Sequence, residues 1–169
     1  DENTRGMVTN LRLQMSNLAE SLLNEKEPKK ALSVLDEMMR ATPRQNVPFS
    51  RVMMPVAETY LQLAGDANVA PNAASLSDED RAHAWTMAQE VVDQFMFMQE
   101  DQIVYCTSLD PEFYVALDRE VQFALQIGDR LVRVMKYYHA GTEEAKALEV
   151  RLTEMEAMVE AYEANYVAL

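Results

Sequence analysis

Residues 17–43, NLAESLLNEKEPKKALSVLDEMMRATP, constrain the fold more than any other stretch of the chain. Two short segments here combine leucine with small residues such as Ala19 and Ala31, and a charged run, EKE, separates them. Pro28 suits the first turn of a helix, and Pro43 disfavours helix in the residue before it. We therefore predict two short antiparallel helices that pack closely through their small residues.

The first of these helices is predicted to run from near Thr4 to Asn24. Its apolar residues recur three, four, three and four positions apart, which places them on one face of a helix: Val8, Leu11, Met15, Leu18 and Leu22. We expect this stripe to face the second helix of the pair.

Four further helices are predicted along the chain. They cover roughly residues 49–63, 77–99 and 111–140, and the region that follows Thr142. Residues 66–76 are small, polar and aperiodic, which predicts an exposed loop, and residues 100–109 are expected to form a connector. Gly128 falls on the apolar stripe of the fifth helix, where it would let another helix approach closely. The sixth helix has a heptad pattern, which predicts packing against another helix.

The composition favours one all-α domain. Nearly half of the 169 residues are apolar and only 4 are glycine. The predicted domain covers residues 1–169, and its three helix pairs lie in 1–43, in 48–99 with the loop 66–76, and in 110–167.

The net charge of −13 argues against nucleic acid and anionic membrane surfaces as partners. No apolar run approaches the ~20 residues that span a bilayer, so we expect no direct membrane insertion by this segment. The chain begins with Asp1 rather than Met, and we expect it to be part of a longer protein.

The first helix pair resembles a tetratricopeptide repeat. The residues that carry the resemblance are Met15, Leu18, Ala19 and Leu22 in the first helix and Ala31, Leu35, Met38 and the closing Pro43 in the second. An interrupted second copy begins at Met53, Val56, Ala57 and Tyr60 and resumes, after the loop, at Ala84, Ala88 and Val91. The resemblance implies a right-handed stack of about six antiparallel helices, with one intact repeat, one interrupted repeat and a C-terminal helical pair.

Residues 1–65 and, more loosely, 110–165 also resemble the C-terminal tail of a bacterial, Bacteroidetes-type family of multi-pass membrane proteins. That family has no known function and has been likened to protein O-mannosyltransferases. The resemblance rests on the stretches NLAESLL and KKALSVLDEMMRATPRQNVPFSRVMMPVAETYLQLAG. It implies a soluble domain, on either side of the membrane, whose parent is glycosyltransferase-like and whose own membrane domain is one of its partners.

Few residues point to catalysis. Asp80 and His83 are three positions apart on a predicted helix, as metal ligands can be, but His139 has no acid three or four positions before it. Cys106 is the only cysteine and cannot form an internal disulfide. We therefore predict no catalytic residues, no metal site and no cofactor. A stand-alone helical-bundle enzyme or metal-binding protein is the alternative.

Protein–protein interaction or scaffolding is the predicted function. In a tetratricopeptide-like stack the first helices of each pair line a concave surface. By that resemblance, the residues expected in the groove are Ser16, Glu20, Asn24, Arg51, Glu58 and Gln62. An extended or helical peptide of basic character is the expected ligand, given the acidic net charge.

Overall fold

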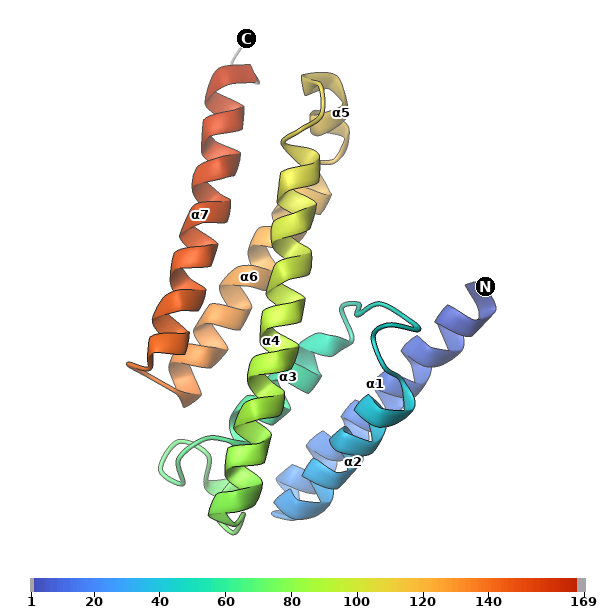
Figure 1. The fold of residues 1–169 in the computed structure, drawn as a ribbon, viewed down its shortest axis with the longest axis vertical. Helices are drawn as coiled ribbons and strands as arrows, with labels where there is room; N and C mark the ends of the chain where they lie inside the picture. The colour runs from blue at the N-terminus through green and yellow to red at the C-terminus, as the bar shows by residue number, and fades with distance from the viewer. Residues whose placement is uncertain (1, 167–169) are drawn as a thin grey trace. The chain divides into compact units, whose positions relative to one another are not determined.

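A computed structural model describes residues 2–166 of the chain, and the secondary-structure elements in this part are all helices, joined by turns and loops, with no strand. The elements, in chain order, are α1 (Glu2–Asn24), α2 (Pro28–Ala41), α3 (Met53–Leu63), the 3-10 helix η1 (Pro71–Ala73), α4 (Asp78–Cys106), α5 (Pro111–Ala116), α6 (Asp118–Tyr138) and α7 (Glu143–Tyr166) (Figure 1). The prediction of an all-α fold is confirmed. Within the described residues, no helix is both long enough and apolar enough to cross a bilayer.

The chain divides into two compact units, residues 1–92 and residues 93–169. The boundary falls inside α4, so that each unit contains part of this helix.

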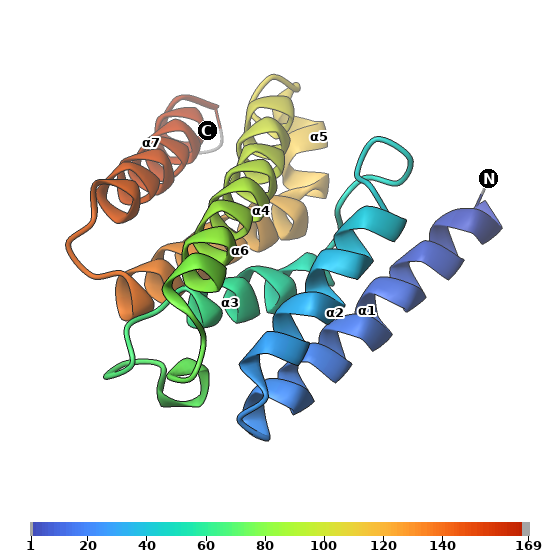
Figure 2. The ribbon, with the colours of Figure 1, turned by 60° about the horizontal axis from the view of Figure 1, so that its bottom comes forward.

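In the N-terminal unit, α1 and α2 form an antiparallel hairpin and lie side by side (Figure 2). Lys26 makes the turn between them in the left-handed region, with φ of 61°, and Glu27 N–H donates to the Leu22 carbonyl at 2.9 Å. Pro28 begins α2, as predicted. Close packing through small residues is also confirmed, because Ala19 and Ala31 are both fully buried.

The buried face of α1 differs from the predicted one. The stripe that was expected to face α2 is partly exposed, and the residues that are buried instead are Arg12, Ser16, Ala19 and Leu23. Successive residues turn by about 100°, so the centres of the two faces lie about 90° apart around the helix. The small side chains of Ser16 and Ala19 allow the α2 backbone to come close, which the bulkier leucines of the other stripe would prevent.

The segment between α3 and α4 is less exposed than predicted. Ala70, Ala73 and Leu76 are buried within residues 66–76, and part of the segment forms η1. The guanidinium of Arg81 donates to the carbonyl oxygens of Gly65 and, at 3.1 Å, Ala73. The prediction of an exposed loop is therefore wrong for about half of its length, because Arg81 and small apolar side chains hold the loop against the unit.

In the C-terminal unit, the second half of α4 packs with α6 and α7. The predicted connector at residues 100–109 is wrong, because α4 continues to Cys106 and buries Ile103 and Cys106 on one face. The predicted fifth helix breaks at Leu117 into α5 and α6, which makes seven α-helices in residues 2–166 rather than about six.

The apolar stripes predicted for the last two helices are buried except at their ends, where Leu117 is half-buried and Tyr166 is exposed. The buried members are Val121, Ala124, Gly128, Leu131 and Met135 in α6 and Ala145, Leu148, Leu152, Met155, Val159 and Tyr162 in α7. Gly128 is also fully packed: a Cβ at this position would lie 3.1 Å from Cδ1 of Leu152 and 3.5 Å from Cε of Met96. The prediction that Gly128 permits a close helix approach is confirmed. Thr142 caps α7 by accepting a hydrogen bond from the Ala145 N–H at 3.2 Å.

Candidate interaction surface

A stripe of apolar side chains along α1 is partly exposed to solvent. It comprises Val8, Leu11, Met15, Leu18 and Leu22, with Met7 at its edge, and we call it the α1 stripe. Leu11, Leu18 and Met7 are 44%, 50% and 73% exposed, and the other three are half-buried. In residues 2–92, the exposed large apolar side chains are Met7, Leu11 and Leu18 of this stripe and Leu13, which lies on the opposite side of α1. Large exposed apolar patches on soluble domains mark binding surfaces.

The surroundings of the α1 stripe carry little charge. Gln14 and Ser21 lie beside it on the side away from α2, and both are exposed and uncharged. Along its whole length α1 has two acidic and two basic residues and therefore no net charge. This neutrality contrasts with the net charge of −13 of the complete chain.

Arg12 fixes the rotation of α1 and so determines which face remains open. Its side chain is fully buried, and its guanidinium donates to the carbonyl oxygens of Thr42 at 2.8 Å, Val47 at 2.7 Å and Pro48 at 2.9 Å. A fourth bond reaches the Thr42 hydroxyl at 3.2 Å, and the Phe49 ring centroid lies 5.4 Å from the guanidinium carbon. Thr42 is the C-cap of α2, where the negative end of the helix dipole favours a cation.

Burial lowers the pKa of Arg12, but an arginine guanidinium stays charged in proteins. The four acceptors and the aromatic ring therefore take the place of the water that the cation loses on folding. The sequence analysis did not single out Arg12. The residue spacing could have identified the buried face that contains Arg12. Arg12, Ser16, Ala19 and Leu23 recur at helical intervals, and two of them, Ser16 and Ala19, are small.

The residues predicted to line a concave groove differ in their accessibility to solvent. Ser16 is fully buried in α1, and its hydroxyl has no hydrogen-bond partner, so the prediction that it lines a groove is wrong. Its small side chain lies on the packed face, where a groove residue would need to be accessible. The other five are at least partly accessible, and their binding role stays a prediction: Glu20, Asn24, Arg51, Glu58 and Gln62.

A second polar cluster joins α2, α3 and α4 in the N-terminal unit. The buried Tyr60 hydroxyl donates to Oδ1 of Asp36 at 2.9 Å, and Nε2 of His83 lies 2.8 Å from Oδ2 of the same carboxylate. Burial, followed by the neighbouring Asp36 charge, raises the pKa of Tyr60 far above its ordinary value. One carboxylate thus connects three helices.

Asp80 and His83, the two residues considered above as metal ligands, have different partners in the structure. The Asp80 carboxylate lies 3.6 Å from Nζ of Lys29, whereas His83 interacts with Asp36. Residues 2–166 contain no group of three or more histidine, cysteine or acidic side chains arranged to hold a metal ion.

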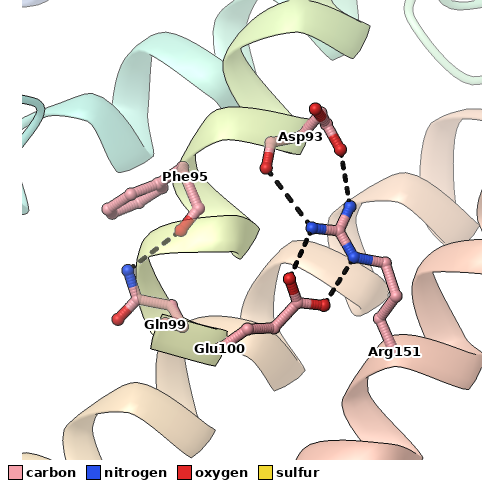
Figure 3. Close-up of polar contacts among 5 residues, drawn as sticks. All are labelled: Asp93, Phe95, Gln99, Glu100 and Arg151. Atoms are coloured by element: carbon pink, nitrogen blue, oxygen red, sulfur yellow. Dashed lines mark hydrogen bonds and ion pairs between the residues drawn. The ribbon is translucent and has the colours of Figure 1, made fainter. Parts of the chain in front are cut away.

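In the C-terminal unit, Arg151 of α7 clamps two acidic residues of α4 (Figure 3). Its guanidinium binds Glu100 through two parallel hydrogen bonds of 2.6 and 2.8 Å, and a third, of 2.7 Å, reaches Oδ1 of Asp93. Beside this clamp lies a hollow of about 170 Å³, whose lining residues are Glu100, Ile103, Val104, Arg151, Glu154, Met155 and Met158. The hydrogen bonds to Arg151 use both carboxylate oxygens of Glu100, which makes the clamp a structural link between α4 and α7.

Comparison of the chain with protein-family models, with curated proteins and with solved structures finds no match. The resemblance to a membrane-protein tail therefore stays a prediction.

Proposed function

We propose that this chain is a non-catalytic scaffold domain that binds another protein through the α1 stripe. The observation that carries the proposal is that three of the four exposed large apolar side chains of residues 2–92, Met7, Leu11 and Leu18, lie along this stripe. Side chains such as Leu11 and Leu18 gain free energy when they leave water, roughly 1.5–3 kcal/mol for complete burial of a leucine. About half of that gain remains available at each of these two positions.

A helix is the partner structure that suits the α1 stripe best. Its residues follow the spacing of one helix face over about 21 Å. An apolar face of this shape is typically covered by another helix that inserts side chains between its own.

A tetratricopeptide-like arrangement is part of the proposal. In the N-terminal unit α3 contacts both α1 and α2, as the first helix of a following repeat would. Ala84, Ala88 and Val91, which resemble the second helix of that repeat, are fully buried in α4. Both findings support a stack of helix pairs, and such stacks serve in general as extended binding surfaces.

The cellular context that we propose comes from the sequence resemblance. The domain would be the soluble tail of a multi-pass, glycosyltransferase-like membrane protein and would support or recruit partners for that parent. Hydrophobic spans upstream of Asp1 in the reading frame would support this context, and a reading frame without them would remove it.

The proposed binding surface can be tested by quantitative capture from an extract of the source cells. The double variant Leu11→Gln, Leu18→Gln removes the centre of the α1 stripe, and Leu13→Gln serves as a matched control because Leu13 is 37% exposed on the opposite side of α1. We expect specific partners to bind the wild type and the control and to be lost from the folded double variant. Retention of the same partners by the double variant would refute the proposal.

A further inference from the structure

We infer that the partner of the α1 stripe is the α1 stripe of a second copy of this chain. The inference rests on the proposed function, because it names the protein that covers the surface proposed there. The spacing, the charge and the size of the stripe support this inference.

The spacing of the stripe is that of a two-helix interface. Val8, Met15 and Leu22 are seven residues apart, and Leu11 and Leu18 fall between them at the complementary heptad position. This alternation of three and four residues allows side chains of two helices to interdigitate along a common line. The face of α1 that packs against α2 is a different one, so the stripe is available without opening the hairpin.

The charge distribution favours self-association through α1 over other faces. The C-terminal unit has fifteen acidic and six basic residues, a net charge of −9, and two copies that met through it would repel each other. On α1 the four charged residues cancel, and Gln14 and Ser21, which would lie beside the contact, are uncharged. Two identical α1 helices can therefore meet without bringing like charges together.

The size of the stripe predicts a reversible dimer. Fifteen residues of helix, from Val8 to Leu22, extend over about 21 Å, which gives an interface at the small end of specific contacts. We expect a dissociation constant on the order of micromolar. Because the contact is apolar and the complete chains repel each other, we also expect added salt to strengthen the dimer.

Sedimentation equilibrium over a concentration series, from about 1 to 500 µM, tests the inference on the full chain. The wild type should change from monomer to dimer in this range, and Leu11→Gln, Leu18→Gln should weaken association at least tenfold. Leu13→Gln should leave it unchanged. Gln14→Glu keeps the apolar residues and adds a like charge beside the contact, so it should also weaken the dimer while circular dichroism shows an intact fold.

A wild type that remains monomeric throughout the series would overturn the inference, as would a dimer that the stripe variants leave unchanged. These results are distinguishable from failure of the proposed function. A monomeric wild type that still captures a partner in a stripe-dependent way contradicts only the second copy as partner. A monomer whose captured partners do not depend on the stripe contradicts both.

Discussion

The guanidinium of Arg12 donates a 2.8 Å hydrogen bond to the carbonyl oxygen of Thr42, the C-cap residue of α2. The hydroxyl of Thr42 in turn donates to the Met38 carbonyl one turn earlier, at 2.7 Å. Arg12 therefore ties the middle of α1 to the end of α2. A rotation of α1 that buried the α1 stripe would move the Arg12 side chain away from all of its acceptors.

Replacement of Arg12 tests this role. Arg12→Met leaves the buried carbonyl oxygens of Thr42 and Val47 without their donor, and we expect the free energy of unfolding to fall by about 2–4 kcal/mol. Arg5→Met is the control, because Arg5 is an exposed arginine on the same helix and should change stability by less than about 0.5 kcal/mol. Urea denaturation followed by circular dichroism measures both, and equal effects would mean that the buried hydrogen bonds of Arg12 contribute nothing.

Local residue patterns predict most of the helices of this chain but not the rotation of α1. Glycine, proline and capping residues mark the ends of α2 and α7, and the stripes of α6 and α7 are buried as their spacing indicates. On α1 two faces compete for α2. Hydrophobicity favours the stripe with Leu11 and Leu18, whereas close approach favours Ser16 and Ala19. The second face is the buried one, and only tertiary packing decides between them.

The end of α4 shows a second limit of local patterns. The run IVYCT, residues 103–107, has residue types that favour strands, but β propensity requires a neighbouring strand. Residues 2–166 contain no such strand, and α4 continues so that Ile103 and Cys106 are buried in the C-terminal unit. Local patterns also misplaced the candidate surface. The spacing of apolar residues identified the α1 stripe but predicted that it would be buried against α2.

Tyr60 should make stability depend on pH in the alkaline range. Its pKa is raised in the folded state by burial and by Asp36, so above the unfolded value of about 10 the unfolded state releases a proton that the folded state keeps. The unfolding free energy then falls with rising pH, by up to about 1.4 kcal/mol per pH unit for this group.

The variant Tyr60→Phe separates the contribution of the Tyr60 hydroxyl to the pH dependence of stability from the contributions of other ionisable groups. It should lower stability by about 1 kcal/mol at pH 7, because the hydrogen bond to Asp36 is lost. Above pH 10 it should lose stability less steeply than the wild type. The raised pKa of Tyr114 is common to both proteins and cancels in the comparison. Parallel pH profiles of the two proteins would contradict the assignment.

The clamp in the C-terminal unit depends on the planar fork of arginine. Arg151→Lys keeps the charge but cannot bind both oxygens of Glu100 and reach Asp93, and we expect a loss of about 0.5–1.5 kcal/mol. Arg133→Lys is the control, because Arg133 forms an exposed ion pair with Asp129. Its free energy of unfolding should fall by less than about 0.5 kcal/mol. Thermal unfolding of the two variants in the same buffer compares them. Indistinguishable melting temperatures would show that the clamp stabilises no more than an exposed pair.

Gly128 should tolerate no large side chain. Gly128→Leu would force the added atoms against Leu152 and Met96, and we expect a destabilisation of roughly 1–3 kcal/mol or more. The matched change Gly6→Leu meets no atom within 4 Å of its Cβ and should be neutral or slightly stabilising, because leucine favours helix more than glycine does. A Gly128→Leu protein as stable as Gly6→Leu would show that α6 does not approach its neighbours closely.

Photo-crosslinking along α1 tests the interaction surface most directly. A photoreactive amino acid placed singly at positions 8 to 24, in the full chain and in extract from the source cells, reports which side of the helix is covered. We predict strong adducts at Leu11, Met15, Leu18 and Leu22 and weak ones at Asn17, Glu20 and Asn24, which gives the three-and-four spacing of the α1 stripe. Adducts concentrated at Glu20 and Asn24, or adducts without helical periodicity, would show that the α1 stripe is not the covered side of the helix.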